Sequence, residues 1–280
     1  MLKRRDEDLN KKVAVINDMS GIGKCSLTVA IPILSCLNVQ PCPFPTALLS
    51  SQTGYPYFSF LDFTDGMINY KEAWNKLNVK FDAIYTGFLG SERQIDIVSE
   101  FILEHKESLI IVDPVMGDHG SMYKTYTEGM CNKIKHLVQN AYIVTPNATE
   151  SCILTGKDYE SNKNNLQFFK ERAIEISNMG PEKVVITGIV NDDMIYNLAY
   201  NKKNNEFFTV SCDYNHKSFS GTGDMFTSIL CGMLLNDYDM KLSVEKATNF
   251  IHKAIDYTVL FETNPNDGVM FEKFLGELIL

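Results

Sequence analysis

The sequence predicts an α/β fold with a mostly parallel central sheet covered by helices on both faces. Short apolar runs recur along the chain, and each is followed by small, polar or acidic residues. The intervals between the runs hold apolar residues at helical spacing, as in residues 95–103. This alternation of strand and helix signals is typical of parallel sheets, because each crossover between parallel strands contains a helix.

Five apolar runs are predicted to form strands, at residues 13–16, 83–85, 109–112, 142–144 and 184–186. Continuous runs of this length indicate strands that are buried on both faces. After the first strand, residues 26–37 predict an amphipathic helix, in which Pro32 must lie early or produce a kink. In open α/β sheets, ligands bind beyond the carboxyl ends of the strands, so we expect the residues that follow these strands to line one crevice.

Two stretches depart from the alternation. Residues 55–63 are rich in aromatic side chains, and we interpret them as an antiparallel flap that covers the site or pairs two subunits. Residues 195–200 and 207–211 flank a polar loop and predict a β-hairpin. The sequence has no evident internal repeat or domain boundary. We therefore expect a polar tail over residues 1–11 and a single domain over residues 12–280.

The composition of the 280 residues, 45% hydrophobic and 22% charged, is that of a globular protein. A formal net charge of −9 argues against binding to nucleic acid or to an anionic membrane surface. The seven cysteines include no C-x-x-C pair, as expected for reduced thiols in the cytoplasm. The charged N-terminus lacks an apolar segment, and no run of about 18 apolar residues occurs, so we expect neither secretion nor a membrane span.

A glycine-rich turn precedes the apolar run at residues 225–235, and it contains Gly221, Thr222, Gly223 and Asp224. Glycine allows the backbone to approach an anion closely, and the free N–H groups at a helix N-terminus favour a phosphate there. The same donors are expected to keep Asp224 ionised. A base beside a phosphate cradle is what phosphoryl transfer to a hydroxyl requires. Taken alone, these four residues favour an ordinary turn with a capping aspartate, because short glycine motifs often match by chance.

The segment after the first strand resembles a P-loop but departs from it at two positions. The pattern G-x-x-x-x-G-K-[ST] would require glycine at Asp18 and a hydroxyl at Cys25. A carboxylate repels phosphate, and a thiol is a poor ligand for Mg²⁺. We therefore favour close approach of a small ligand at Gly21 and Gly23, with a hydrogen bond from Asp18 or Ser20. A purely structural glycine turn is the alternative, and Lys24 then has no ligand role.

Two further strand ends carry candidate ligands for a hard cation. Asp113 follows a strand and is a candidate to hold Mg²⁺ or a metal-bound water, although aspartate before proline also commonly starts a turn. Asn147 and Glu150 lie on one face of the helical turn predicted after Pro146. Their oxygen atoms suit Mg²⁺, with a helix cap as the alternative. Together with the glycine turn, these residues indicate a kinase. A Ser/His/Asp nucleophile scheme fits less well, because the five histidines form no recognisable catalytic pattern.

The residues in this order resemble the ribokinase superfamily and, within it, the pyridoxal (pyridoxine, pyridoxamine) kinase family, from about Val13 to the final helices. Residues 221–224 match the G-T-G-D signature. The resemblance implies a ribokinase-like three-layer fold, an anion hole formed by Gly221, Thr222 and Gly223, and a catalytic base at Asp224.

Two more motifs match the family. Residues 113–118 match D-P-V-x-G-D and residues 145–150 match T-P-N-x-x-E, stretches that the resemblance associates with Mg²⁺ and ATP. The resemblance implies ATP-binding roles for Asp113, Asn147, Glu150 and Thr187, metal roles for Asp113 and Glu150, and a monovalent cation such as K⁺ at Thr145. It also implies that Tyr123 lies near the substrate.

The expected substrate segment departs from the family pattern. S-N-H-T-x-Y is represented by residues 50–55, which retain Thr53 and Tyr55 but not the Asn-His pair. Asp18 stands where many members have serine, and its charge suits a cationic pyridine nitrogen or an aminomethyl group. These departures leave hydroxymethylpyrimidine kinases open as an alternative, since they share the fold and the aspartate base.

We therefore expect a cytoplasmic, homodimeric enzyme that phosphorylates the hydroxymethyl group of pyridoxal, pyridoxine or pyridoxamine with ATP. The sequence is also compatible with a noncatalytic protein that binds a nucleotide or a vitamer and, less well, with a P-loop NTPase.

Overall fold

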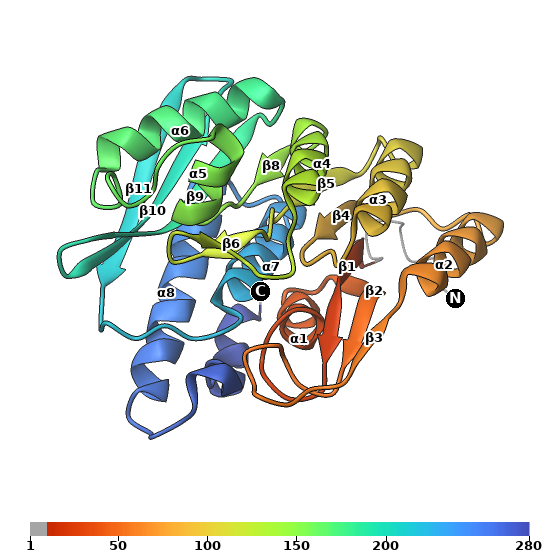
Figure 1. The fold of residues 1–280 in the computed structure, drawn as a ribbon, viewed down its shortest axis with the longest axis horizontal. Coiled ribbons are helices and arrows are strands. Elements are labelled where there is room, and N and C mark those ends of the chain that lie inside the picture. The colour runs from red at the N-terminus through yellow and green to blue at the C-terminus, as the bar shows by residue number, and fades with distance from the viewer. Residues whose placement is uncertain (1–9, 280) are drawn as a thin grey trace, which may run out of the picture.

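The computed structural model describes residues 10–279, and within them one nine-stranded sheet lies between two layers of helices (Figure 1). Nine residues of the predicted polar tail, 1–9, lie outside this range. The strand order is β11-β10-β9-β8-β5-β4-β1-β2-β3. The predicted α/β class is therefore confirmed.

Six neighbouring strands of the sheet are parallel. They are β1 (Lys12–Ser20), β2 (Gln40–Leu49), β4 (Ala83–Thr86), β5 (Leu109–Val112), β8 (Ile143–Val144) and β9 (Lys183–Asn191). Antiparallel strands complete the two edges: β3 (Phe60–Asp62) pairs with β2, and β10 (Met194–Asn201) and β11 (Glu206–Asp213) form the predicted hairpin beside β9. Because the six parallel strands point the same way, the residues after them meet at one edge of the sheet.

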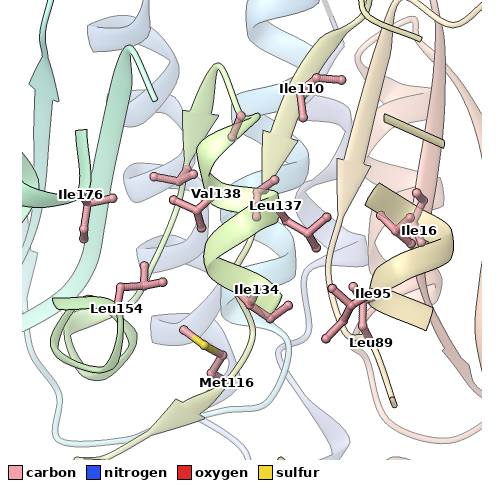
Figure 2. Packing of buried hydrophobic residues seen from close by; sticks show 14 of the residues in the cluster. Ile16, Leu89, Ile95, Ile110, Met116, Ile134, Leu137, Val138, Leu154 and Ile176 are labelled. Carbon is pink, nitrogen blue, oxygen red and sulfur yellow. The ribbon is translucent and has the colours of Figure 1, made fainter. Parts of the chain in front are cut away.

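The two faces of the sheet have separate hydrophobic cores. One face is covered by α1 (Leu27–Cys36), α7 (Thr222–Leu235), α8 (Met240–Thr258) and the 3-10 segment η3 (Glu272–Leu278). The other is covered by α2 (Thr64–Lys76), α3 (Glu92–Glu104), α4 (Glu128–Gln139), α5 (Ala148–Thr155) and α6 (Leu166–Met179), and Figure 2 shows this second core. Strand β1 serves both cores, because Val13 and Val15 pack on the first and Ala14 and Ile16 on the second.

Strand β2 is absent from the expected set because three prolines hide its strand signal. Pro41, Pro43 and Pro45 alternate along it, and the N–H of Gln40 donates to the carbonyl of Lys11 in the neighbouring chain segment. The three prolines therefore direct their missing N–H groups to the opposite side, where β3 pairs only with Ala47–Leu49. No ladder hydrogen bond is lost, so the prolines are tolerated at this edge.

Smaller departures concern Pro32 and the aromatic flap. Pro32 lies within α1 and not in its first turn. Of the aromatic stretch 55–63, only Phe60–Asp62 forms an antiparallel strand, whereas residues 51–59 form a loop. The remaining short elements are a two-stranded ribbon of β6 (Gly117–Asp118) and β7 (Ser121–Met122), and the 3-10 turn η2 (Pro265–Asp267).

Candidate active site

The predicted site residues gather where the parallel strands end. Asp113 directly follows β5, and Thr145 directly follows β8. Thr187 lies within β9 and forms an isolated parallel bridge with Asn147. Asp224 lies in the first turn of α7 and accepts a hydrogen bond from Asn17 near the end of β1.

The glycine turn forms the N-terminus of α7 without a side-chain cap. Gly221 is the N-cap residue, with φ of 82°, and no side chain of the described residues caps the helix. Gly223 is exposed in the first turn, and a Cβ atom there would lie 3.8 Å from Oδ2 of Asp113. The first N–H groups of α7 therefore have no side-chain cap within the described part of the chain and are available to an anion.

Asp224 is half-buried beside this turn, and burial raises its pKa to about 6. The nearby charge of Asp18 raises the pKa further, whereas hydrogen bonds from the Ser26 N–H and from Asn17 lower it. Loss of hydration therefore outweighs the hydrogen-bond donors at this position and raises the pKa of Asp224. The group is still mostly ionised at neutral pH, as a general base must be.

Asn17 and Ser26 hold the two oxygens of Asp224, and the sequence analysis does not single out either residue. Nδ2 of Asn17 donates to Oδ1 at 2.9 Å, and the backbone N–H of Ser26 donates to Oδ2 at 2.8 Å. The place of Asn17 directly after an apolar run is a signal that points to it. Ser26 acts through its backbone, for which the sequence carries no signal.

Asp18 lies under this pair and not in an open pocket. It is 7% exposed, and its two oxygens accept hydrogen bonds from the hydroxyls of Ser26, at 2.6 Å, and Ser20, at 3.0 Å. Burial raises its pKa, and the two hydroxyls partly offset this effect. Asp18 and Ser20, each expected to hydrogen-bond a small ligand, are hydrogen-bonded to each other instead.

Asp113 forms a buried polar chain with two threonines. The hydroxyl of Thr227 donates to Oδ2 of Asp113 at 3.4 Å and lies 2.9 Å from the hydroxyl of Thr145. Burial, and then the charges of Glu150 and Asp224, hold the pKa of Asp113 well above its usual range. The charges of Glu150 and Asp224 add to the effect of burial, so three acidic groups lie close together here.

Asn147 and Glu150 form the capping box that the sequence leaves open as the alternative. Oδ1 of Asn147 accepts the N–H of Glu150, and Oε2 of Glu150 accepts the N–H of Asn147, both at 2.8 Å. The remaining polar atoms of both side chains are also hydrogen-bonded: Nδ2 of Asn147 donates to the Gly117 carbonyl, and Oε1 of Glu150 accepts the Met116 N–H. Burial raises the pKa of Glu150 to about 8.

The oxygen atoms of Asp113, Glu150 and Asp224, the acidic group of this site, suit a hard cation. They do not form a complete coordination shell by themselves. No lysine or arginine of residues 10–279 forms an ion pair with Asp113, Glu150 or Asp224. The same part of the chain has no cluster of three His, Cys, Asp or Glu side chains arranged to hold a metal. Carboxylates that lack a countercharge and a full cage suit Mg²⁺, which keeps water and nucleotide oxygens as ligands.

The two predicted substrate residues differ in position. Tyr123 is 42% exposed beside the acidic group, and burial of its hydroxyl followed by the charges of Glu150 and Asp118 raises its pKa. Thr53 is exposed on the loop of residues 51–59. This loop is tied to η2 by hydrogen bonds of Tyr55 to Asp267 and of Asn266 to the Gly54 carbonyl.

The segment that resembles a P-loop is packed within the protein. A Cβ atom on Gly21 would lie 2.9 Å from the Ser50 carbonyl, and one on Gly23 would lie 2.6 Å from the Gln52 side chain. Nζ of Lys24 forms an ion pair with Glu272 at 3.2 Å. These contacts favour the structural alternative for the two glycines, and they direct Lys24 toward η3.

At the carboxyl edge of a parallel sheet, the site combines the uncapped N-terminus of α7, the hydrogen-bonded Asp224 and the acidic group. This combination defines a phosphotransferase with a ribokinase-like fold. A model of the phosphomethylpyrimidine kinase family matches residues 35–268, and the chain belongs to this family.

Similar proteins include both kinds of kinase that the sequence suggests. The pyridoxine/pyridoxal/pyridoxamine kinase of Bordetella avium is 28% identical over 86% of this chain and 83% of its own length. The hydroxymethylpyrimidine/phosphomethylpyrimidine kinase of Bacillus subtilis is 29% identical over 64% of this chain, and the match spans 65% of the Bacillus protein. A crystal structure from Bacteroides thetaiotaomicron, of a protein provisionally assigned as a phosphomethylpyrimidine kinase and determined with pyridoxal, is 42% identical. It matches with a TM-score of 0.92 over 97% of this chain and 96% of that chain.

Within residues 10–279, the helices are too short or too polar to span a membrane.

Proposed function

We propose that this protein is a kinase that transfers a phosphoryl group from ATP to the hydroxymethyl group of pyridoxal, pyridoxine or pyridoxamine. The observation that carries the proposal is the position of Asp224, whose carboxylate is held beside the uncapped N-terminus of α7. A base and an anion site in one helical turn suit transfer of a phosphoryl group to a hydroxyl.

Asp224 is the proposed base. With a pKa of about 6 it is mostly ionised at neutral pH, and it accepts the proton of the substrate hydroxyl as the phosphoryl group arrives. The N–H groups of residues 221–223 stabilise the charge on the moving phosphoryl group, which is commonly the largest single contribution at such sites. We propose Thr187 as a further contact to ATP, because it lies beside Asn147 at the same sheet edge.

Asp113, Asn147 and Glu150 are the residues proposed to organise Mg²⁺, through retained waters where their own atoms are already bonded. Bound Mg²⁺ would neutralise negative charge on the ATP phosphates. The Thr145 hydroxyl, beside Thr227, is the proposed contact for a monovalent cation such as K⁺.

The choice of a B6 vitamer is supported by the relative with pyridoxal bound, which is 42% identical, and by the longer match to the Bordetella kinase. We propose Tyr123 and Thr53 as substrate contacts. Hydroxymethylpyrimidine or its phosphate is the second candidate, because the matching family model describes phosphomethylpyrimidine kinases.

We also propose that the enzyme works in the cytoplasm as a homodimer. Strand β3 is a short sheet edge with Phe60 44% and Leu61 58% exposed, and Tyr57 on the adjoining loop is 88% exposed. Exposed apolar side chains grouped at one edge are typical of a protein interface. A Leu61→Asp variant should be monomeric by light scattering if this edge pairs two copies.

A coupled assay of ATP consumption tests the function. The panel contains pyridoxal, pyridoxine, pyridoxamine, hydroxymethylpyrimidine and its monophosphate, with Asp224→Ala as the inactive control. We expect turnover that depends on an added vitamer. Turnover with the pyrimidines alone would make hydroxymethylpyrimidine or its phosphate the substrate in place of a B6 vitamer. If none of the five compounds causes ATP consumption, a noncatalytic binding protein would be supported.

A further inference from the structure

Both oxygens of Asp224 are held by residues from the end of β1 and from the segment between β1 and α1. The Asn17 donor to Oδ1 and the Ser26 donor to Oδ2 are 207 and 198 residues away in the sequence. A carboxylate with a donor on each oxygen loses at least one hydrogen bond when it rotates. The orientation of Asp224 is therefore set from outside its own helix.

The side-chain amide of Asn17 has only one orientation that satisfies its neighbours. Its Oδ1 accepts the backbone N–H groups of Asp18, at 3.0 Å, and Phe88, at 2.9 Å. Because those groups can only donate, the amide oxygen must face them and Nδ2 must face Asp224. Asn17 is 1% exposed, and a Cβ atom on Gly87 would lie 2.3 Å from its Nδ2, so a glycine is needed beside it.

Ser26 is held by Asp18 in a backbone conformation that serine rarely adopts. Its φ is 53° and its ψ is −132°, and a residue with a side chain keeps such angles only where its surroundings hold it there. The Ser26 hydroxyl donates to Oδ1 of Asp18 at 2.6 Å, and Ser20 donates to the other oxygen. The buried Asp18 thereby stabilises the conformation that directs the Ser26 N–H at Asp224.

We propose that Asn17 and Ser26 are positioning residues for Asp224, and that Asp18 anchors Ser26. The inference rests on the proposed function, because it takes Asp224 as the group that meets the substrate hydroxyl. In this proposal Asp18 binds the Ser26 hydroxyl and does not contact the substrate ring. Loss of the Asn17 donor frees the carboxylate to rotate, and misplacement of a reacting group by about 1 Å can cost about 100-fold in rate.

A double-mutant cycle tests the role of Asn17. In the full-length enzyme, Asn17→Ala should lower kcat by about 100-fold and leave KM for ATP within about twofold. In an Asp224→Ala background the same change should lower kcat no further, because there is no carboxylate left to position. Equal losses in the two backgrounds would mean that Asn17 is merely structural, and would overturn the inference.

A second variant covers the case in which Asn17→Ala does not fold. Asn17→Asp is isosteric and keeps an acceptor for the N–H groups of Asp18 and Phe88, but at pH 8 it has no donor for Asp224. It should show the same loss of kcat, and wild-type kcat in a folded Asn17→Asp enzyme would contradict the inference.

A crystal structure of Asn17→Ala, or of Asn17→Asp where the first variant is unfolded, gives a readout that is independent of turnover. The carboxylate of Asp224 should leave its wild-type torsion angle or become disordered, and an unchanged carboxylate would overturn the inference. A wild-type enzyme that turns over none of the five substrates would refute the proposed function alone. The two failures are therefore distinguishable.

Discussion

Gly221 lies against the backbone of Lys24, so closely that a Cβ atom on Gly221 would be 2.0 Å from the Lys24 carbonyl oxygen. The same atom would be 3.0 Å from Cα of Cys25. The backbone of Lys24 and Cys25 leaves no room for a side chain, and the φ of 82° at Gly221 also disfavours one. This contact joins the start of α7 to the segment before α1, and so brings Asp224 to Asn17 and Ser26.

Gly221→Ala should destabilise the protein and disrupt the active site. The positive φ alone costs about 1–3 kcal/mol for a residue other than glycine, and the contact with Lys24 adds to it. We expect a lower urea midpoint and a large loss of kcat. Gly223→Ala is the matched control for stability, because its Cβ atom meets nothing nearer than 3.8 Å, and its urea midpoint should not fall below the wild-type value. Equal midpoints for Gly221→Ala and the wild type would contradict the prediction.

Asp224→Ala should remove the base and leave the nucleotide site in place. General-base catalysis typically contributes about 10²- to 10⁴-fold, so we expect kcat to fall by this order. KM for ATP should change by no more than a few-fold, since the N–H groups of the turn belong to the backbone. Initial-rate kinetics with each active substrate make the measurement. Near-normal turnover in this variant would exclude Asp224 as the base.

The rate should depend on pH through the same carboxylate. Burial raises the pKa of Asp224 to about 6, and only the ionised form accepts a proton. We therefore expect kcat to be constant above about pH 7 and to fall about tenfold for each unit below pH 6. A rate that stays level down to pH 5, in an enzyme that is still folded, would be inconsistent with this role.

Thermal stability without Mg²⁺ should decrease as the pH rises. Asp18, Asp113, Glu150 and Asp224 all have raised pKa values in the folded protein, so the folded state binds protons more tightly than the unfolded state. Their contribution is fully present below the unfolded values and is lost as each group ionises. For Glu150 this window runs from 4.5 to about 8.

Added Mg²⁺ should oppose this loss, because a bound cation compensates the ionised carboxylates. Melting temperatures measured from pH 5 to 8.5, with and without Mg²⁺, should diverge with rising pH. Asp113→Asn is the control and should reduce the divergence. Curves that stay parallel across the range would argue against a cation among these residues.

Lys24→Ala should have little effect on turnover. The ion pair of Lys24 with Glu272 is partly exposed, and such pairs contribute about 0–1 kcal/mol. We expect kcat and KM for ATP within about twofold of the wild type in the assay used for Asp224→Ala. A strong loss in Lys24→Ala together with an active Asp224→Ala would instead favour a P-loop NTPase.

Much of the fold could be predicted because its signals are local. Buried parallel strands such as β5 need continuous apolar residues, and the hairpin of β10 and β11 needs a polar loop between two apolar runs. Strand β2 could not be predicted, because its prolines are acceptable only where one side of the strand is left without a partner. Whether a strand lies at a sheet edge depends on the rest of the fold.

Some residues of the candidate site could likewise be predicted from the sequence, and others could not. The glycine turn, Asp113 and the motif from Thr145 to Glu150 can be found from residue types and spacing. Their partners could not be found, because hydrogen bonds such as that from Asn17 to Asp224 join residues far apart in the sequence. The direction of the pKa shift at Asp224 was equally inaccessible, since it depends on how much water the folded chain removes.

The sequence by itself determined the α/β class, the glycine turn before a helix and the acids at the strand ends, because each depends on the character of a few consecutive residues. Only the tertiary structure decided that Asn17 and Ser26 hold Asp224, that Asp18 is bonded to serines, and that Asn147 and Glu150 cap α5. The physical reason is that hydrogen-bond partners and burial are set by the packing of distant segments at one sheet edge.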